Sequence, residues 1–234
     1  MEDKKTLLIV EDDKYIINFI SMTLKKEEYA FFVAKSVEEA VSLFYANQPD
    51  LIILDLGLPD GDGMEVIKSV REVSDIPIIV VSARQEEGEK IQALDAGADD
   101  YVTKPFNPLE LVARVKSQLR RYTQLGSTAN HKNEAVYEVG GLSINDDLKE
   151  VTVDGEPVKL TPIEYNILLL LVKNQGKVFS IDQIYESIWN EDAIGVDNTV
   201  AVHIRHIREK IEINPKEPRY LKVVWGVGYK VEKL

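Results

Sequence analysis

The sequence contains no cysteine among its 234 residues, and this absence excludes several kinds of chemistry. Without a thiol the chain cannot form a disulfide, use a thiolate nucleophile, or hold zinc or an iron–sulfur cluster through cysteine. We therefore expect any metal site to use oxygen ligands.

The sequence also lacks long apolar runs. None approaches the roughly 18 residues that a membrane-spanning helix needs. The charged start of the chain, Met1 to Thr6, leads straight into a strand-like segment and carries no apolar signal region. We therefore expect a cytoplasmic protein with no membrane contact.

The length and charge suggest two domains with different electrostatic character. A chain of 234 residues with 44% hydrophobic side chains is long enough for two ordinary domains. Its net charge of −12 argues at first against nucleic acid, because phosphate groups favour basic surfaces. However, residues 1–122 hold 23 acidic and 15 basic side chains (−8), whereas residues 201–234 hold 4 and 8 (+4). Any DNA contact is therefore expected at the C-terminal end.

The first half of the chain alternates short apolar runs with amphipathic stretches. The apolar runs are Thr6–Val10, Ala30–Val33, Leu51–Leu54, Ile78–Val81 and Asp100–Val102. Helical periodicity occupies about residues 13–27, 37–47, 63–73, 86–96 and 107–121. Strands that are apolar throughout are buried on both faces, so this order predicts an α/β domain with a doubly wound, five-stranded parallel sheet. In such sheets a functional site lies beyond the carboxyl ends of the strands.

The pattern changes after Tyr122. Residues 123–136 are polar and aperiodic, and we interpret them as a linker. Short strands then follow, with turn signals at Gly140-Gly141, Asn145-Asp146-Asp147 and Asp154-Gly155-Glu156-Pro157, which favour antiparallel pairing. Three helices with caps at Thr161, Ser180 and Asp197 precede a closing hairpin at 220–232. The prediction is a first domain over 1–122 and an α+β domain over 137–234.

Polar side chains follow the strands of the first domain. Glu11 and Asp12 come after strand one, Asp55 after strand three, Ser82 ends strand four and Lys104 follows strand five. Parallel strands bring these positions together, and clustered carboxylates need a compensating cation. Mg²⁺ (or Mn²⁺) fits oxygen ligands of this kind. Asp55 would then be a nucleophile toward phosphorus, with Lys104 offsetting charge on the phosphoryl oxygens and Ser82 donating a hydrogen bond.

Each of these residues, taken singly, has a simpler explanation. Asp12 or Asp13 can cap a helix, Asp55 can belong to a turn, and Lys104 can be a solvated charge. The joint placement at four strand ends favours a phosphoryl site.

The motifs in this region identify a resemblance. They are Ile9-Val10-Glu11-Asp12-Asp13, Leu54-Asp55-Leu56-Gly57-Leu58-Pro59-Asp60-Gly61, Val81-Ser82-Ala83, Gly97-Ala98-Asp99-Asp100-Tyr101 and Thr103-Lys104-Pro105-Phe106. With them, residues 4–121 resemble the receiver domain of bacterial two-component response regulators. The resemblance implies that Asp55 accepts phosphate from a histidine kinase. It implies that Glu11, Asp12, Asp55 and the Gly57 carbonyl hold Mg²⁺. It also implies that a cis proline bond follows Lys104, and that Ser82 and Tyr101 form the switch pair.

A set of charged residues accompanies the last helix and strand of this domain. The set is Lys90, Asp99, Asp100, Glu110, Arg114 and Arg121. It can be an ordinary charged surface, on which single ion pairs contribute little. In regulators of the OmpR/PhoB type a similar set pairs across a two-fold dimer. That resemblance implies the pairs Lys90 with Glu110, Asp100 with Arg114, and Asp99 with Arg121.

The helix at 197–212 has one apolar face, formed by Val200, Ile204, Ile207 and Ile211. The opposite faces carry Thr199, Val202, His203, Arg205, His206 and Arg208. Such a helix can enter a major groove, or it can be an amphipathic surface helix without a DNA role.

Residues 137–232 resemble the OmpR/PhoB winged-helix effector through Leu160-Thr161-Pro162-Ile163-Glu164, Thr199-Val200-Ala201-Val202-His203-Ile204-Arg205 and Gly226-Val227-Gly228-Tyr229. The resemblance implies that Asn198, Val202 and His206 read bases, while His203, Arg205, Arg208 and Tyr229 contact phosphates. The loop at 190–196 would face RNA polymerase. His206 and Trp225 stand where many relatives carry arginine, so Trp225 is expected to pack either on a sugar or within the wing itself.

Two other functions remain open. Haloacid-dehalogenase-type phosphatases also use an aspartyl phosphate, but they carry a second acid two residues later, where this chain has Gly57. We therefore expect no enzyme beyond self-phosphorylation and slow dephosphorylation. The second alternative is a winged helix that binds protein and not DNA. The favoured hypothesis is phosphorylation at Asp55, dimerisation and binding to promoter DNA.

Overall fold

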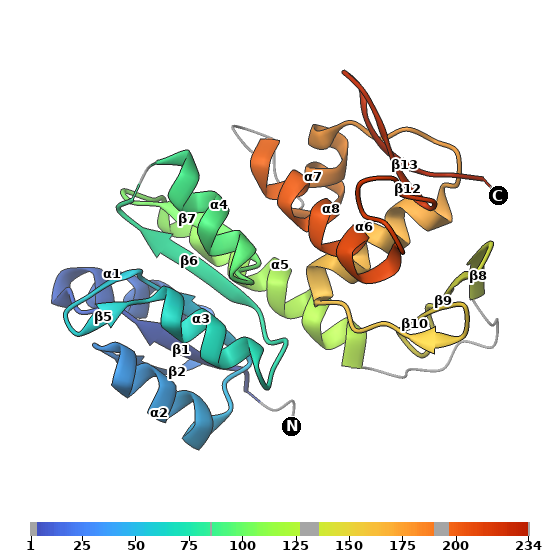
Figure 1. Ribbon diagram of the computed structural model, residues 1–234. Helices are drawn as coiled ribbons and strands as arrows, with labels where there is room; N and C mark the ends of the chain where they lie inside the picture. The colour runs from blue at the N-terminus through green and yellow to red at the C-terminus, as the bar shows by residue number, and fades with distance from the viewer. Residues whose placement is uncertain (1–3, 85, 127–135, 190–196, 234) are drawn as a thin grey trace. The chain divides into compact units, whose positions relative to one another are not determined.

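The computed structural model describes residues 4–84, 86–126, 136–189 and 197–233 of the chain, without the side chains of 123–126 and 197 (Figure 1). The chain divides into two compact units, Met1–Arg120 and Arg121–Leu234.

Five parallel strands form the sheet of the first unit, in the order β2-β1-β3-β6-β7. Their bounds are β1 Thr6–Val10, β2 Ala30–Ala34, β3 Leu51–Leu54, β6 Ile78–Ser82 and β7 Asp100–Thr103. β1 lies between β2 and β3, with Ile9 opposite Val33 on one side and Ile53 on the other. This confirms the doubly wound parallel sheet, and it places the reversal of strand order between β1 and β3, where ligands bind in such folds.

Helices cover both faces of this sheet. They are α1 Lys14–Lys25, α2 Val37–Asn47, α3 Met64–Arg71, α4 Glu87–Asp95 and α5 Pro108–Gly126. α1 and α5 pack on one face, where Leu24 and Val115 join Ile9 and Ile53 in one core. α2 and α3 lie side by side on the other face (Figure 1). In β1, β3 and β6 strand residues of both alternating sets are buried, as the continuously apolar runs predict, whereas in the edge strand β2 only Ala34 is buried.

A short hairpin that the sequence analysis did not predict follows β3. It consists of β4 Gly57–Leu58 and β5 Gly61–Asp62. In its turn, the Asp60 carboxylate accepts the backbone N–H groups of Val37 and Glu38 at 2.8 and 3.1 Å. These are unpaired donors of the first turn of α2, and their hydrogen bonds lower the pKa of Asp60. The segment after Asp55 is thereby joined to α2.

The second unit contains two antiparallel sheets and three helices. The sheets comprise β8 Val136–Val139, β9 Leu142–Asn145, β10 Glu150–Val153 and β11 Glu156–Pro157, followed at the end of the chain by β12 Leu221–Val224 and β13 Gly228–Val231. The helices are α6 Pro162–Lys173, α7 Ile181–Trp189 and α8 Asp197–Ile211. The strands β8, β9, β10 and β11 pair antiparallel, each with the next one along the chain, and β12 pairs antiparallel with β13. The predicted order of short strands, three helices and a hairpin is confirmed.

α6 is the central helix of this core. Its predicted capping box is present: Glu164 N–H donates to Thr161 Oγ1 at 3.5 Å, and Thr161 N–H donates to Glu164 Oε2 at 2.8 Å. Buried residues occur on all sides of α6, including Ile163, Leu168 and Val172. A helix that is apolar all round is expected inside a domain.

The predicted linker differs from the structure at its start. α5 continues to Gly126, four residues into the segment 123–136, and β8 begins at Val136. Residues 123–125 contain neither proline nor glycine, so their helix propensity allows α5 to continue. The polar composition of the whole segment nevertheless favours a loop. The rest of that segment lies outside the described residues.

Asp146 connects the turn between β9 and β10 to α6. Its carboxylate accepts hydrogen bonds from Lys149 at 2.6 Å, Lys173 at 2.7 Å and the Tyr165 hydroxyl at 2.8 Å. Burial alone would raise the pKa of Asp146, but the three hydrogen bonds and the lysine charges lower it to about 2. The same contact and burial raise the pKa of Tyr165.

Substitution of Asp146 by Asn is expected to lower the free energy of unfolding by about 2 kcal/mol at pH 7, since the carboxyl pKa falls on folding. This stabilisation is present above the ordinary carboxyl pKa of 3.8 and is lost as the pH falls toward about 2. Urea unfolding followed by tryptophan fluorescence measures it, because Trp189 and Trp225 both lie in the second unit. The matched control is Asp147→Asn at the exposed neighbour. Equal losses in the two variants would contradict the assignment.

Candidate functional site

The strand ends meet at one edge of the parallel sheet, and the predicted acidic residues meet there. Glu11 follows β1 and is 2% exposed, and Asp55 follows β3 and is 8% exposed. Asp12, next to Glu11, is exposed. Carboxylate oxygens of Glu11, Asp12 and Asp55 lie within 4.8 Å of one another. The convergence that the sequence predicts is therefore present.

Lys104 lies between two of these carboxylates. Its Nζ donates to Glu11 Oε2 at 2.6 Å and to Asp55 Oδ2 at 2.5 Å. Burial raises the pKa of Glu11, against the opposing effect of Lys104. Burial by itself would lower the pKa of Lys104, but its hydrogen bonds to Asp55 and Glu11 raise that pKa above its ordinary value. The predicted cis peptide bond between Lys104 and Pro105 is present.

The chemistry of this donor set fits a hard divalent cation. Three carboxylates face one ammonium group, which leaves an excess of two negative charges (3 − 1 = 2). All the clustered ligand atoms are oxygens, as Mg²⁺ and Mn²⁺ prefer. Gly57 lies beside them, and its N–H donates to Asp55 Oδ1 at 3.1 Å.

Gly63 is a further requirement of the pocket that the sequence analysis did not interpret. A Cβ at this position would lie 2.5 Å from the Asp55 carbonyl oxygen and 2.8 Å from Leu56 Cα. The backbone at the start of α3 therefore lies directly against the backbone of Asp55. Only glycine allows this approach without displacing the backbone of Asp55.

The predicted switch residues are both buried. Ser82 at the end of β6 is 1% exposed, and Tyr101 in β7 is 5% exposed. The Tyr101 hydroxyl donates to the carbonyl oxygen of Arg84 at 2.8 Å. Burial raises the pKa of Tyr101, while a side-chain hydrogen bond with Ser82 acts in the opposite direction. The two residues lie on neighbouring strands, where Tyr101 is opposite Val80 and Ser82 is opposite Thr103, and their role as a switch pair stays a prediction.

Arg84 is a residue that the sequence analysis missed. Its Nη1 donates to Asp62 Oδ2 at 3.0 Å, and its Nε lies 3.8 Å from Glu89 Oε1. These contacts join the segment after β6 to the β4–β5 hairpin and to α4. All three side chains are about a third exposed or more, so the ion pairs are expected to be weak.

The charged set near α4, β7 and α5 is less exposed than an ordinary surface. Asp99 and Asp100 are 1% and 2% exposed, and Arg121 is 6% exposed. Within this single chain Arg114 donates to Asp100 at 2.8 Å and to Glu110 at 2.9 Å. Lys90 is half-buried on α4.

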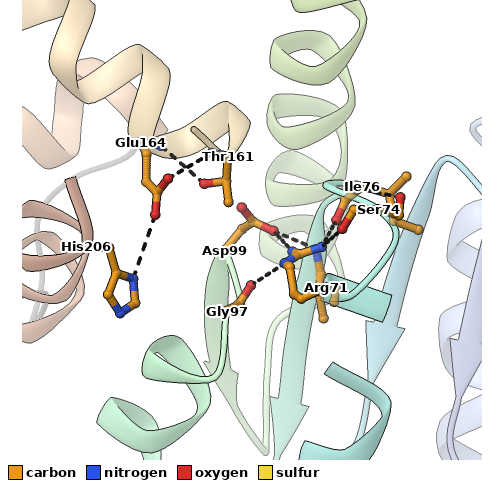
Figure 2. Close-up of polar contacts among 9 residues, drawn as sticks. Arg71, Ser74, Ile76, Gly97, Asp99, Thr161, Glu164 and His206 are labelled. Carbon is orange, nitrogen blue, oxygen red and sulfur yellow. Dashed lines mark hydrogen bonds and ion pairs between the residues drawn. The ribbon is translucent and has the colours of Figure 1, made fainter. Parts of the chain in front are cut away.

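The carboxylate of Asp99 accepts a hydrogen bond from Arg71 at 2.7 Å (Figure 2). The sequence analysis did not identify Arg71. The pairs across two copies stay predictions.

α8, the helix expected to enter the major groove of DNA, has the predicted core face. Val200, Ile204, Ile207 and Ile211 are all buried in the core of the second unit. Arg205 is exposed, and Asn198, His206 and Arg208 are half-buried.

Three residues expected on the open faces of α8 are buried. Thr199, Val202 and His203 are 2%, 7% and 3% exposed. For His203 the cause is α7: its ring lies 5.9 Å from that of Trp189. α8 therefore buries a wider arc than its four aliphatic residues predict.

Two carboxylates fix α8 to its surroundings. Glu164 of α6 accepts Lys210 Nζ at 2.6 Å and lies 3.8 Å from His206 Nδ1 (Figure 2). Glu212 accepts the backbone N–H groups of Arg219, Tyr220 and Leu221 at 2.6 to 2.9 Å. The first contact holds α8 against α6, and the second fixes the start of β12 at the end of α8.

Arg208 lies where α8 meets the β12–β13 hairpin. Its Nε donates to the Leu221 carbonyl oxygen at 2.9 Å, and its guanidinium lies 5.8 Å from the Tyr229 ring centre. In the described part of the chain its Nη2 has no hydrogen-bond partner. Burial lowers the pKa of Arg208, but an arginine remains charged at neutral pH. The Nη2 nitrogen is buried and not open to solvent, so contact between Arg208 and a DNA phosphate stays a prediction.

The hairpin of β12 and β13 is the wing of this domain. Trp225 lies in its turn and is 87% exposed. The alternative that Trp225 packs within the wing is therefore wrong, because the hairpin is held elsewhere. Phe179 and Tyr229 exchange two backbone hydrogen bonds of 2.9 Å. A Cβ at Gly228 would lie 1.9 Å from the Phe179 carbonyl oxygen, so this contact requires glycine.

Two remaining predictions fall partly or wholly outside the described residues. The loop at 190–196 is one, and the capping role of the Asp197 side chain is the other. A search of the described helices found none long and apolar enough to cross a membrane.

Both halves of the chain match known protein families. Residues 7–116 match the family described as the response regulator receiver domain, and residues 155–231 match the family described as transcriptional regulatory protein, C terminal. The chain is 42% identical over 234 residues to the regulatory protein VanR of Enterococcus faecium, covering 100% of both chains. It is 39% identical over 233 residues to the alkaline phosphatase synthesis transcriptional regulatory protein PhoP of Bacillus subtilis, covering 98% and 97%.

Solved structures show the same relationship. DrrB of Thermotoga maritima, described as an OmpR/PhoB homolog, is 31% identical with a TM-score of 0.50, covering 98% of this chain and 99% of that one. A mutant of RitR is 25% identical with a TM-score of 0.71, covering 98% and 100%. Because full-length relatives exceed one third identity and both halves match their families, the chain belongs to the OmpR/PhoB family of two-component response regulators.

Proposed function

We propose that this chain accepts a phosphoryl group on Asp55 from a sensor histidine kinase and in response dimerises and binds promoter DNA. The observation that carries the proposal is the pair of contacts from Lys104 to the buried carboxylates of Asp55 and Glu11 in an acidic cluster. A carboxylate nucleophile next to a fixed cation suits the transfer of a phosphoryl group, whose oxygens carry negative charge.

Each residue of the pocket would have its own role in the phosphoryl transfer. Asp55 provides the attacking oxygen, while the N–H of Gly57 and the ammonium group of Lys104 orient its carboxylate. Glu11, Asp12, Asp55 and the Gly57 carbonyl would hold Mg²⁺ or Mn²⁺, which neutralises charge on the transferring group when bound. Ser82 would donate its hydroxyl to the product.

The position two residues after Asp55 carries no acid that could support rapid turnover. Position 57, two residues after the nucleophile, is glycine, so no carboxyl group there can protonate a leaving group or activate water. We therefore propose that the chain catalyses only its own phosphorylation and slow dephosphorylation. This fits a timed switch better than a phosphatase.

The output would reach DNA through α8 and the wing. Phosphorylation would bias Ser82 and Tyr101, and through them the α4–β7–α5 face, toward a two-fold dimer. α8 would enter the major groove, with Asn198, Val202 and His206 near bases and Arg205 and Arg208 near phosphates. Burial of Val202 in the present structure means that this residue must become accessible before it can read a base. Trp225 would reach a sugar or the adjacent minor groove.

The remaining parts of the proposal concern partners and place. RNA polymerase would contact the segment 190–196, and the protein would work in the cytoplasm. Both extend the two-component role of the family.

Substitution of Asp55 by Asn should abolish phosphorylation. With a small phosphodonor and Mg²⁺, the wild type should gain the mass of one phosphoryl group, measured by intact-protein mass spectrometry, and should sediment as a dimer. Asp13→Asn is the matched control, because Asn caps α1 as well as Asp does and the residue lies outside the acidic cluster. A mass gain in Asp55→Asn equal to that of the wild type would rule out this nucleophile.

Substitution of Asp12 by Asn should weaken Mg²⁺ binding at least about tenfold, since it removes one of three clustered carboxylates. Isothermal titration calorimetry with MgCl₂ measures the affinity. The neighbouring Asp13→Asn, which removes the same charge one residue later, should leave it nearly unchanged. If the two variants lose affinity equally, net charge and not coordination determines the binding.

Substitution of Arg205 by Ala should weaken binding to double-stranded DNA of mixed sequence and reduce the slope of log K against log salt by about one. Arg205 is exposed, and its ion pair with Glu209 at 3.7 Å is weak. Fluorescence anisotropy at several salt concentrations gives the slope. Lys68→Ala, which removes an exposed cation from α3, should leave it unchanged. Binding of the wild type that is independent of salt would favour a protein partner over DNA.

A further inference from the structure

Arg71 at the end of α3 makes an unusual number of contacts for one side chain. Its Nε donates to the Gly97 carbonyl oxygen at 2.9 Å, and its Nη1 donates to the carbonyl oxygens of Ser74 and Ile76 at 3.2 and 2.7 Å. Its Nη2 donates to Asp99 Oδ2 at 2.7 Å (Figure 2). The side chain is only 13% exposed. We call these five residues the Arg71 cluster.

The cluster joins segments that are distant in sequence. Ser74 and Ile76 belong to the connection between α3 and β6, whereas Gly97 and Asp99 belong to the connection between α4 and β7. The planar fork of a guanidinium can bind acceptors in several fixed directions, which a lysine cannot do. Arg71 therefore fixes the end of α4 and the start of β7 relative to α3.

The absence of a side chain at Gly97 leaves room for the side chain of Arg71. Its φ of +113° lies in the region that favours glycine, and an added Cβ would lie 2.9 Å from Arg71 Cγ and 3.2 Å from its Nε. The Gly97 and Ala98 N–H groups donate to Leu94 and Ala93 at 2.9 and 3.0 Å, which ends α4. The termination of α4 and the position of Arg71 thus depend on each other.

Asp99 is held from two sides. Besides Arg71, its Oδ2 accepts the N–H of Ile78 at 2.9 Å, and its own N–H donates to the Ile78 carbonyl oxygen at 2.9 Å. The side chain is 2% exposed. A carboxylate buried to this degree is strongly unfavourable without its cation, so Asp99 depends on Arg71.

The next residue turns to the other side of the strand. Asp100 accepts Arg114 of α5 at 2.8 and 3.0 Å, because successive side chains of a strand point to opposite faces. Two adjacent carboxylates thus attach β7 to α3 through Arg71 and to α5 through Arg114. Both sides of the α4–β7–α5 face are positioned by these ion pairs.

We infer that Arg71 is a positioning residue for the dimerisation face: through Asp99 and Gly97 it sets where the end of α4 and the start of β7 lie. In this assignment Asp99 anchors the start of β7 inside the chain, and Arg71 is one of its partners. The inference rests on the proposed function, because that function assigns dimerisation to the α4–β7–α5 face.

The cluster lies away from the phosphorylation pocket. Asp99 directly precedes β7 and Ile78 begins β6, whereas Lys104 directly follows β7 and Ser82 ends β6. Five residue steps lead from Asp99 to Lys104, which in an extended strand span about 16 Å. Loss of Arg71 should therefore spare phosphorylation and impair its effect on assembly.

The test uses the full chain with Arg71→Gln, Asp99→Asn, the double variant, and Lys68→Gln as a control that removes an exposed cation one turn earlier on α3. Hydrogen–deuterium exchange of the unphosphorylated proteins is measured first. Arg71→Gln should speed exchange at the amides of residues 97–99 at least about tenfold and leave the Asp55 and Gly57 amides unchanged. Unchanged exchange at 97–99 overturns the inference, whether or not the chain dimerises.

Sedimentation with a small phosphodonor and Mg²⁺ gives the second readout. Arg71→Gln and Asp99→Asn should gain one phosphoryl group as the wild type does, but dimerise about tenfold more weakly, and the double variant should be no weaker than either single variant. Additive losses in the double variant would mean that Asp99 acts independently of Arg71, and they would overturn the inference.

Arg71→Lys serves where Arg71→Gln fails to fold. It keeps the charge but loses the fork, so exchange at 97–99 should still rise; exchange equal to that of the wild type overturns the inference. A wild type that never gains phosphate contradicts the proposed function alone, and the exchange measurement still decides the role of Arg71.

Discussion

The ammonium group of Lys104 lies between two buried carboxylates that would repel each other without it. Glu11 and Lys104 are 93 residues apart in sequence, and only the parallel sheet brings them into contact. The sheet in turn depends on strands that can be buried on both faces, such as Leu51–Leu54 and Ile78–Ser82. The pocket is therefore a direct result of strand composition.

Sequence reasoning found this pocket because its signals are local. Continuous apolar runs predict the strands, and the residue after each run is placed by topology alone. The contacts of Arg71 could not be found in this way. Three of its four acceptors are backbone carbonyls, and their directions depend on how two distant loops fold.

The errors in the second unit have a similar cause. Helical periodicity identified Val200, Ile204, Ile207 and Ile211 as core, but it could not show that α7 places Trp189 against His203. The exposure of Trp225 was open for the same reason, since the wing is held by a backbone contact at Phe179 and by the glycine at 228. Periodicity describes one helix or strand, whereas burial depends on its neighbours.

The two tryptophans of the chain lie in opposite environments. Trp189 is 2% exposed and stacks on Tyr185 with ring centres 4.6 Å apart, whereas Trp225 is 87% exposed at the tip of the wing. A water-soluble quencher of fluorescence thus reaches one indole and spares the other. The protein carries an intrinsic optical reporter at the wing, with an internal reference in the core of the same unit.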